Sequence, residues 1–541
     1  MKLVNIATMH AIEQEANQNG LTFEMMMENA GRELGRWVDH HLANRREKAV
    51  TGLIGPGNNG GDTLIALEYL AKHGWKVFAY LARPRSTDDP LPGRLTAVGG
   101  AIFTGADDAG GEKLTICLAQ SGIVLDGVLG TGFRLPLKPE IAALLSQVKQ
   151  TLADEQDVYI VAVDCPSGVD CDSGEAAPEV IAANTTVCMA AVKEGLLRYP
   201  AFGLSGGLVV VNIGLPDDLS GYHSIHREVV DEEMVRNWLP QRPVDAHKGT
   251  FGTALMVAGS VNYTGAALLA GKAAYRSGAG LVMMAVVEPL YTALAGQFPE
   301  CIWLLLPHEN GVIASGASDL IRKNSSKATA MLLGSGWGLE EPTSKFLNRL
   351  LDIGATQGKG AWGFAPLSAA AASPAAPILP PLVVDADGLK LLVRIPNWYE
   401  LLPKLTVLTP HPGEMSILCG LSKDDIQADR EAVAMKFARQ WGHVVVLKGA
   451  FTVVADPDGR LAIIPVATPA LARAGTGDVL AGIITGLRAQ GMSAFEAAAA
   501  GAWIHGQAGL LAAQNMGNTA SVLAGDVVNA VAGVFSRLIP C

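Results

Sequence analysis

Short apolar runs rich in β-branched residues alternate with longer amphipathic segments through the first part of the chain, from Lys48 to about Ile213. Runs of this length favour strands buried on both faces, and the segments between them are long enough for crossover helices. Strands joined in this way form a parallel sheet with right-handed connections. The expected strands are residues 48–54, 76–82, 123–130, 158–164, 185–191 and 208–214.

A second alternation of the same kind follows and ends in Gly- and Ala-rich helices. Between Gly214 and His247 the pattern gives way to a segment rich in charged residues, Pro and His, which indicates a domain boundary. We therefore expect an α/β protein with two domains, residues 1–220 and 229–541. The expected strands of the second domain are residues 253–260, 280–287, 330–336, 382–387, 405–410, 443–449 and 451–456.

One segment, residues 354–381, interrupts the second alternation with a run of Ala, Pro and Gly. Long loops without structure of their own are uncommon inside compact domains. The composition therefore favours a surface insertion or linker over a functional lid.

The composition argues against two classes of partner. The 541 residues carry a formal net charge of -11 and no dense cluster of Lys and Arg, which argues against a nucleic-acid surface. No run reaches about 18 uninterrupted apolar residues, so we expect no membrane span and interpret the apolar segment 494–513 as a buried helix. The start of the chain has no signal-peptide pattern, and the seven cysteines are scattered without a CxxC pair. A reducing cytoplasm is the expected location.

Three segments rich in glycine and small residues end expected strands of the first half: GPGNNGGDT at 55–63, LDGVLGTGFRLP at 125–136 and AVDCPSGVDCDSG at 162–174. Glycines at a strand end let backbone N–H groups approach a phosphate, although Asn-Gly is also an ordinary turn pair. The carboxyl ends of parallel strands are where doubly wound sheets bind ligands. We therefore expect the segments to converge on one site with Asp126 and Asp164, while helix capping or turn formation is an open alternative for each carboxylate.

With MMENAGRELG near the start, these segments resemble the NAD(P)H-hydrate epimerase family over about residues 1–215. The resemblance implies a Rossmann-like three-layer domain that interconverts the R and S epimers of hydrated NADH and NADPH. It also implies that Asp164 contacts the hydrated nicotinamide ring and that a potassium ion is held by Asn59, Asp126 and Ser167. The residues implied to surround the dinucleotide are Asn58, Asn59, Gly60, Gly61, Asp62, Gly130, Thr131, Gly132, Phe133, Arg134, Leu135 and Pro136.

The chemistry of these residue types suits the implied roles. Potassium is a hard cation, and such cations prefer the oxygens of amides, carboxylates and hydroxyls. Inverting the hydrated C6 centre requires proton transfer at its hydroxyl or at the ring, for which Asp164 is a suitable acid/base. One departure is Thr63, where the family usually has Gly. If a left-handed conformation is needed there, a β-branched residue disfavours it and the loop must differ.

The segment ALARAGTGDVLAGIITGL at 470–487 is the most informative part of the second half. Gly475 and Gly477 flank Thr476 before an apolar helix, so free backbone N–H groups would face a phosphate at the helix start. Asp478 follows, where it can take a proton from a hydroxyl that attacks a phosphoryl group, with a simple helix cap as the alternative. The helix dipole lowers the pKa of Asp478 and a nearby phosphate raises it, and we expect the carboxyl to be ionised at neutral pH.

GTGD before a helix resembles the ribokinase-like superfamily, and no Walker motif points to a P-loop kinase. Six further segments narrow the resemblance to the ADP/ATP-dependent NAD(P)H-hydrate dehydratases over about residues 229–541: HKGTFG, GSVNYTGAALLAGKAAYRSGAGLV, LGSGWG, VVDADGLKLL, LTPHPGEM and VVLKG. The resemblance implies a ribokinase-like α/β domain in which ADP or ATP, with Mg²⁺, drives dehydration of the S-hydrate. The residues implied to line the nucleotide are Lys448, Gly449, Ala450, Phe451, Thr452, Gly475, Thr476 and Gly477, and those implied to touch the hydrate are Ala266, Gly338, His411 and Asp478.

Three residues of this half have more than one interpretation. For His411 a substrate contact is favoured over a structural histidine, and a metal site with Glu414 comes last because no third ligand stands at helical spacing. Lys448 precedes a glycine, which suits phosphate contact, whereas a lysine at a strand end is usually solvated. Arg473 stands two residues before the glycines, where it strengthens nucleotide binding or points to solvent.

Together the two halves predict a metabolite repair enzyme in which an epimerase supplies a stereospecific dehydratase. Its expected partners are the hydrates NADHX and NADPHX and the nucleotides ADP or ATP, with ADP preferred because bacterial relatives generally use it. We also expect a homo-oligomer, as in family relatives. One alternative is a ribokinase-like small-molecule kinase with an N-terminal dinucleotide-binding module, which would release a stable phosphorylated product. The other alternative is a first half that binds a dinucleotide without converting it.

Overall fold

The computed structural model describes residues 1–45, 48–153, 157–216, 218–351 and 379–539. The chain forms two compact units, Met1–Val229 and Val230–Cys541. The first unit extends past residue 220 because the Val229 N–H donates a 2.7 Å hydrogen bond to the carbonyl of Met1, so this segment is tied to the N-terminus. Most of the Ala/Pro-rich insertion expected at 354–381 lies outside the described residues.

The first unit is built on a parallel sheet with the strand order β4-β3-β2-β5-β6-β7-β9. The chain runs from β2 to β3 and β4, then crosses to the other side of β2 to form β5. The order therefore reverses between β2 and β5, and ligands of doubly wound sheets bind at such a switch point. The strands are β2 (Ala49–Ile54), β3 (Lys76–Leu81), β4 (Ala101–Thr104), β5 (Ile123–Gly127), β6 (Tyr159–Val163), β7 (Thr185–Met189) and β9 (Gly207–Val211).

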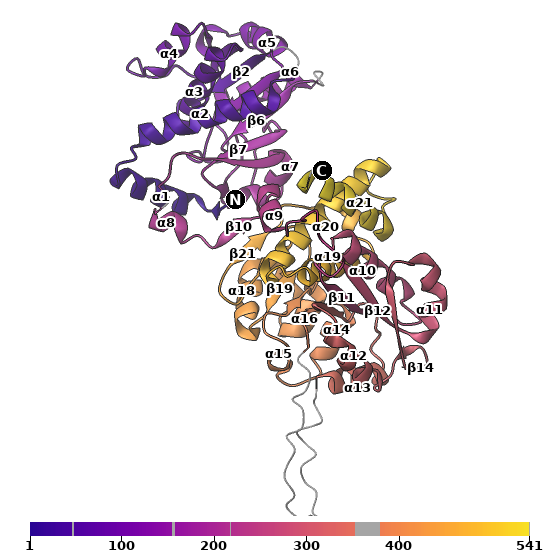
Figure 1. Ribbon diagram of the computed structural model, residues 1–541. Coiled ribbons are helices and arrows are strands. Elements are labelled where there is room, and N and C mark those ends of the chain that lie inside the picture. Colours follow the sequence, from indigo (N-terminus) through magenta and orange to yellow (C-terminus); the bar gives the residue numbers. More distant parts are fainter. Residues whose placement is uncertain (46–47, 154–156, 217, 352–378, 540–541) are drawn as a thin grey trace, which may run out of the picture. The chain divides into compact units, whose positions relative to one another are not determined.

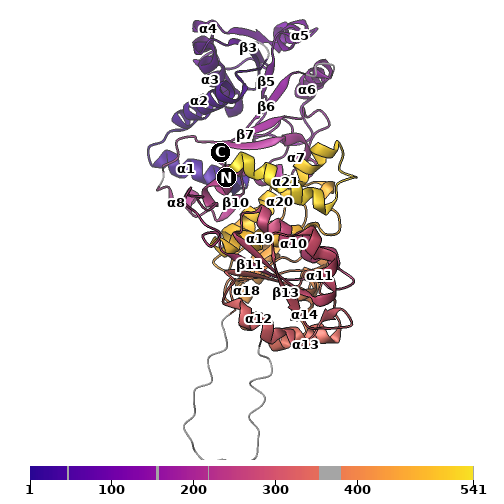
Figure 2. The ribbon, with the colours of Figure 1, turned by 45° about the vertical axis from the view of Figure 1, so that its right-hand side comes forward.

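Helices cover both faces of this sheet and make the three layers expected of a Rossmann-like domain (Figures 1 and 2). On one face, α2 begins after the Thr22 cap and buries Ala30, Leu34 and Val38, which are spaced four residues apart. On the other face, α5 and α6 bury a separate group of leucines against Leu53 and Val124. The helices are α1 (Ile6–Gln18), α2 (Phe23–Leu42), α3 (Asn58–Lys72), α4 (Leu91–Ala97), α5 (Glu112–Ala119), α6 (Pro139–Leu152), α7 (Ala201–Ser205) and α8 (Ser220–His223).

Short strands complete the first unit around its N-terminus. β1 (Leu3–Val4) pairs in parallel with β8 (Val192–Lys193), and β10 (Arg227–Val229) follows α8. The β1–β8 pair places Lys193 beside the N-terminal segment, which precedes α1. This small sheet therefore brings a residue that follows β7 next to the start of the chain.

The second unit has a sheet with the order β21-β20-β19-β18-β17-β16-β11-β12-β13. Its strands from β19 to β13 are parallel, and β20 and β21 add an antiparallel edge. The strands are β11 (Thr253–Val257), β12 (Leu281–Val287), β13 (Ile302–Leu306), β16 (Ala330–Leu333), β17 (Leu382–Val384), β18 (Val407–Leu408), β19 (Val444–Leu447), β20 (Val453–Ala455) and β21 (Leu461–Ile463), with a separate hairpin of β14 (His308–Glu309) and β15 (Val312–Ile313).

Small residues let the helices of the second unit approach closely. A Cβ on Gly482 would lie 2.2 Å from the carbonyl oxygen of Ala270, so α10 and α19 can pack only with glycine at that position. The long helix α20 is lined with buried alanines, as expected for the apolar segment 494–513. The helices are α9 (Glu232–Trp238), α10 (Thr264–Arg276), α11 (Glu288–Leu294), α12 (Ala317–Ser325), α13 (Glu341–Leu350), α14 (Asp387–Leu392), α15 (Trp398–Leu401), α16 (Pro412–Cys419), α17 (Lys423–Ala428), α18 (Arg430–Trp441), α19 (Thr476–Ala489), α20 (Ala494–Met516) and α21 (Ala524–Leu538).

Candidate functional site

A cavity of about 680 Å³ opens at the switch point of the first sheet. The loop after β2 and the start of α3 form one side of it, and the segment after β5 forms another. The three glycine-rich segments therefore converge, as their order predicted. The predicted site residues that line this cavity are Asn58, Asn59, Asp62, Gly130, Thr131, Gly132, Phe133, Arg134, Pro136 and Asp164.

Gly60 and Gly61 do not line the cavity, although the sequence grouped them with its binding residues. Both lie in the buried first turn of α3. A Cβ on Gly60 would come within 2.1 Å of the carbonyl oxygen of Gly55, and one on Gly61 within 2.5 Å of the sulfur of Met27. Their role in this structure is close packing. Leu135 also lies outside the cavity lining.

Thr63 fits the helix without strain. It lies inside α3, is fully buried, and its hydroxyl donates a 2.6 Å hydrogen bond to the carbonyl of Asn59. A left-handed conformation is therefore not required at this position. The loop change that Thr63 would have forced in that case does not arise.

The three residues implied to hold potassium form one connected group. The buried Asp126 carboxylate accepts hydrogen bonds from the N–H and hydroxyl of Ser167, at 2.8 and 2.5 Å. The Ser167 hydroxyl oxygen accepts from the Leu129 N–H at 2.9 Å, and the Asn59 amide donates to the Leu129 carbonyl at 3.2 Å. Burial raises the pKa of Asp126, while the bonds from Ser167 oppose that shift. These oxygens are of the type that a hard cation prefers.

Asp164 is held by a lysine that the sequence analysis did not single out. The Lys193 ammonium donates to the Asp164 carboxylate and, at 3.1 Å, to the carbonyl of Met189. Asp164 also accepts from the Met189 N–H at 2.9 Å and has a φ of 66°, a strained value for a residue other than glycine. Lys193 is 1% exposed, and although burial lowers its pKa, the charge and hydrogen bond of Asp164 together with nearby cysteines outweigh burial and raise it.

Further charged residues missed by the sequence analysis also line the cavity. Glu13 and His10 come from α1, far from any of the glycine-rich segments. Arg83 and Lys138 join Arg134 to give the lining three cationic side chains. Their sequence signal is weak, because isolated charged residues on a helix or after a strand are usually solvated.

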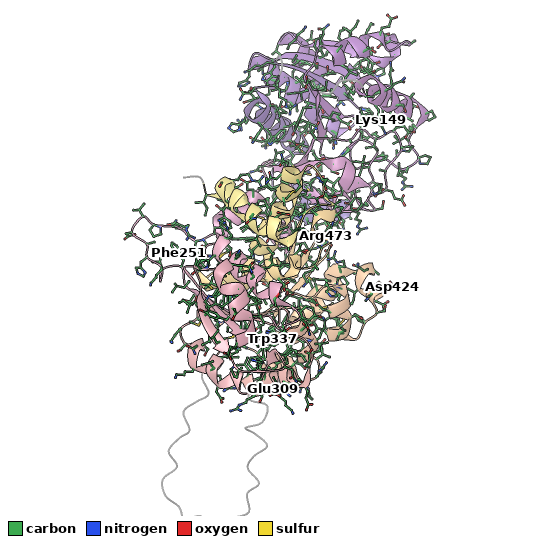
Figure 3. The ribbon with its side chains drawn as sticks, turned by 90° about the vertical axis from the view of Figure 1, so that its right-hand side faces the viewer. Lys149, Phe251, Glu309, Trp337, Asp424 and Arg473 are labelled. Atoms are coloured by element: carbon green, nitrogen blue, oxygen red, sulfur yellow. The ribbon has the colours of Figure 1, made fainter. Side chains whose placement is uncertain are left out.

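In the second unit, the predicted site residues follow the carboxyl ends of adjacent parallel strands. Gly338 follows β16, His411 follows β18 and Lys448 follows β19, and the intervening β17 is followed by Asp385. The loop after β16 is anchored by the buried Trp337, labelled in Figure 3, whose indole N–H donates to the Val257 carbonyl at 2.8 Å. This edge of the sheet is where ligands of open α/β sheets bind.

Lys448 is partly buried among carboxylates and is not the fully solvated lysine that is usual at a strand end. Its ammonium lies 2.7 Å from the Asp385 carboxylate and 3.6 Å from that of Glu414. Burial lowers the pKa of Lys448, but Asp385 and Glu414 outweigh burial and raise it. The Thr409 hydroxyl also donates to Asp385 at 2.7 Å. Asp385 and Glu414 belong to the quoted segments, but neither was assigned to the site.

The GTGD segment forms the turn and helix start that its glycines predicted. Gly475 has a φ of 89° and caps α19, whose first residues are Thr476 and Gly477. A Cβ on Gly477 would lie 3.6 Å from the Lys448 ammonium, so the helix start and the lysine are neighbours. Ionisation of Asp478 at neutral pH was expected, but burial, reinforced by Asp385, raises its pKa to about 7. The carboxyl is therefore only partly ionised at that pH.

His411 has a structural task that the sequence did not reveal. Its Nδ1 accepts hydrogen bonds from the N–H groups of Gly413 and Glu414, at 2.9 and 3.3 Å, so that it caps α16. Glu414 completes the capping box by accepting from the His411 N–H at 3.0 Å. Burial lowers the pKa of His411, which suits a neutral ring that accepts at Nδ1. Its Nε2 lies 3.3 Å from the Glu414 carboxylate, and the ring is half-exposed.

The remaining predicted residues lie in the loops around this site. The loop Lys448–Thr452 is held by Arg430, which donates to the carbonyls of Leu447 and Ala450. Ala266 packs beside Gly336, where a Cβ would lie 2.7 Å from that of Ala266. The exposed Arg473, labelled in Figure 3, donates to the carbonyl of Ala520.

Two further features bear on the chemistry and location of the described residues. No group of three or more His, Cys, Asp or Glu side chains in that part of the chain is arranged to hold a metal ion. No helix within the described ranges is both long and apolar enough to cross a membrane.

Two family models match the chain. The model of YjeF-related protein N-termini matches residues 23–195, and the model of NAD(P)H-hydrate dehydratases matches residues 254–531. A crystal structure of an ADP/ATP-dependent NAD(P)H-hydrate dehydratase from Bacillus subtilis, co-crystallised with ATP/Mg²⁺, is 29% identical and covers 58% of this chain and 99% of its own, with a TM-score of 0.46. A yeast crystal structure covers 41% of this chain and 94% of its own at 22% identity, with a TM-score of 0.35.

Relatives of known function match both units in one alignment. The bifunctional NAD(P)H-hydrate repair enzyme of Moorella thermoacetica is 34% identical over 99% of this chain and 97% of its own length. The enzymes of the same description from Salinibacter ruber and Escherichia coli are 35% and 32% identical, over 90% and 95% of this chain and 88% and 90% of theirs. The chain therefore belongs to the family of bifunctional NAD(P)H-hydrate repair enzymes.

Proposed function

We propose that the first unit interconverts the R- and S-hydrates of NADH and NADPH, and that the second unit dehydrates the S-hydrate at the expense of ADP or ATP. The observation that carries this proposal is common to both units. Each has a carboxylate, Asp164 or Asp478, close to a lysine at the carboxyl ends of its parallel strands, the buried Lys193 or the partly buried Lys448. Such a carboxylate can accept a proton from the hydroxyl of a bound hydrate.

In the first unit, Asp164 acts as the base at the hydrated C6 centre. It is ion-paired with Lys193 at the edge of the cavity that it lines. Arg83, Arg134 and Lys138 supply positive charge to the dinucleotide phosphates, together with N–H groups of the loops that line the cavity. The chain has a net charge of -11, so this local basic lining has to offset the overall repulsion of an anionic substrate.

The residues Asn59, Asp126 and Ser167 fit a potassium ion. The Asp126 carboxylate is fully buried, and within the described residues no Lys or Arg side chain pairs with it. A bound potassium ion would supply the missing positive charge and hold the strand ends together. The ion is expected to order the loops around Leu129.

In the second unit, Asp478 takes the proton of the C6 hydroxyl while that oxygen attacks the terminal phosphoryl group of ADP or ATP. The N–H groups at the start of α19 and the Lys448 ammonium stabilise the charge on the phosphoryl oxygens. The ring nitrogen lone pair then expels phosphate, and transfer of the C5 proton to the released phosphate or to water restores the dihydropyridine ring. Hydrolysis of the nucleotide thus drives removal of water from the hydrate.

Magnesium fits the second site as a companion of the nucleotide. Asp385 and Glu414 are carboxylates beside Lys448, and carboxylates are hard ligands. No dedicated protein cage was found among the described residues, and Mg²⁺ usually keeps waters and binds to phosphates with only one or two carboxylates. When bound, the ion would neutralise phosphate charge.

An assay of the full chain tests both assignments at once. Mixed R- and S-hydrates are supplied with ADP or ATP, with and without potassium, and recovery of NADH absorbance is followed with chromatography of the residual epimers. Asp164→Asn should leave the R-hydrate unconverted while the S-hydrate is still consumed. Asp478→Asn should still interconvert the two epimers but recover no NADH from either. The assignments fail if either variant retains the parent rate, and a stable phosphorylated product would favour the kinase alternative.

We propose a cytoplasmic homo-oligomer as the form of this enzyme. The cysteines of the described residues are free thiols, which suits a reducing compartment. Light scattering of the purified chain measures its assembly, and a monomer at working concentration would contradict that part of the proposal.

A further inference from the structure

The epimerase cavity contains more acidic groups than one base requires. Glu13 from α1, Asp62 from α3 and Asp164 after β6 all line it. One ammonium group, that of Lys193, interacts with all three through its charge. Three carboxylates that share one buried cation cannot all be ionised at low cost.

The hydrogen bonds show which carboxylate has the compensating charge. Lys193 and the Met189 N–H both donate to Asp164. By contrast, the Asp62 carboxyl has no hydrogen-bond or ion-pair partner within the described residues, although Asp62 is only 5% exposed. Its remaining contact is with the cavity, which it lines from the first turn of α3. A buried carboxyl without a partner is stable only in its neutral form.

The electrostatics of the surrounding groups also favour a neutral Asp62 carboxyl. Burial raises the pKa of Asp62 well above its ordinary value, Asp164 and Glu13 raise it further, and Lys193 opposes them. Burial also raises the pKa of Glu13, against the charges of Lys193 and His10. Two nearby carboxyls whose surroundings favour opposite protonation states are a common basis for an acid and base pair.

We propose that Asp62 is the proton donor of the epimerase site and works opposite Asp164, the proton acceptor. This inference rests on the proposed role of Asp164. Asp62 is then a catalytic residue in addition to its implied place in the dinucleotide site.

The pair accounts for inversion at C6 without any further reactant. Asp164 takes the proton of the C6 hydroxyl, the O–H electron pair forms a C=O bond, and the N1–C6 bond breaks. The electron pair of that bond goes to N1, which receives the proton of Asp62, so the ring opens to an aldehyde. Rotation about the C5–C6 bond presents the other face of the carbonyl, and the reverse transfers close the ring as the other epimer. Both carboxyls end in their starting states.

The test uses Asp62→Asn in the full-length chain, with Asp88→Asn as a matched control on the exposed surface. Conversion of pure R-hydrate to S-hydrate measures the first unit, and dehydration of pure S-hydrate in the same preparation shows whether the second unit is intact. We expect kcat for epimerisation to fall by about 10²–10⁴-fold with little change in KM. Thermal unfolding should be unchanged, because Asn replaces a neutral carboxyl of the same shape. Asp88→Asn should match the parent chain in every measurement.

A second variant distinguishes proton donation from a structural role. The groups facing Asp62 are Glu13, Asp164 and Lys193, with His10 next to Glu13. Glu13→Gln removes a charge that raises the Asp62 pKa, so the alkaline limb of kcat/KM for epimerisation should move to lower pH. This measurement tests proton donation by Asp62 even if the Asp62→Asn chain fails to fold.

The outcomes separate this inference from the proposed function. If Asp62→Asn epimerises at the parent rate while Asp164→Asn is inactive, Asp62 is not the donor and the role of Asp164 stands. An alkaline limb that stays in place in Glu13→Gln also overturns the inference. If both aspartate variants match the parent rate, the assignment of Asp164 fails as well.

Discussion

The replacement Lys193→Met tests the buried ion pair on which the epimerase site depends. Met has a similar length but no charge, so it fills the space of a side chain that is 1% exposed. Asp164, 7% exposed, would lose its cation and retain only the Met189 N–H among the donors described here. Removing one partner of a buried pair usually costs about 3–5 kcal/mol, because the other charge stays buried without compensation. We expect a loss of this size in the free energy of unfolding of the first unit.

Guanidinium unfolding of the full chain, followed by hydrogen exchange of peptides from each unit, measures this loss. Peptides of the second unit provide an internal reference that should not change. The double variant Lys193→Met, Asp164→Asn removes both charges, so its cost should be smaller than the sum of the two single costs. The reasoning is refuted if Lys193→Met costs less than about 1 kcal/mol, which is the value of an exposed pair.

The pH dependence of the stability difference between the parent and Lys193→Met chains follows from the direction of the Lys193 pKa shift. The pKa of Lys193 is raised in the folded chain above the value of about 10.4 for a free lysine. The stabilisation is therefore fully present below that value and is lost as the pH rises through the folded pKa. The parent and Lys193→Met chains should differ equally at neutral and mildly alkaline pH, and converge only in strongly alkaline solution.

Three further predictions concern single residues. The pKa of Asp478 is raised to about 7, and the base must be ionised to act. We therefore expect kcat/KM for S-hydrate dehydration to rise with pH through about 7 and then level off. A flat profile across neutral pH would exclude Asp478 as the titrating base. Thr63→Gly restores the usual family residue and should destabilise the first unit by about 1–2 kcal/mol in thermal unfolding. The reason is that it removes the hydrogen bond from the Thr63 hydroxyl to the Asn59 carbonyl and places glycine inside a helix. A gain in stability would contradict this prediction. Arg473→Ala should change the KM for the nucleotide by no more than about twofold from the parent value, because a surface substitution typically costs no more than about 0.5 kcal/mol. A tenfold rise in this KM would assign Arg473 to the nucleotide site.

Most of the sheet architecture could be predicted from the hydrophobic pattern. Strands buried on both faces are continuous apolar runs, and the long segments between them require parallel neighbours. The strands that escaped prediction include β4 and β21, which are short, and β13, an apolar run at the edge of its sheet. The reversal of strand order between β2 and β5 has no local sequence signal, because it depends on which pairs of strands meet.

The sequence by itself determined which strand ends carry the chemistry, because glycine-rich turns and aspartates are local features. Only the tertiary structure decided how those groups are charged. Lys193 looks unremarkable in a run of apolar residues, yet its burial next to Asp164 makes it the charge partner of the site. Likewise, the GTGD segment predicts a helix start, but burial and Asp385 set the pKa of Asp478. Protonation depends on desolvation and on neighbours distant in the chain, and neither quantity exists before the chain is folded.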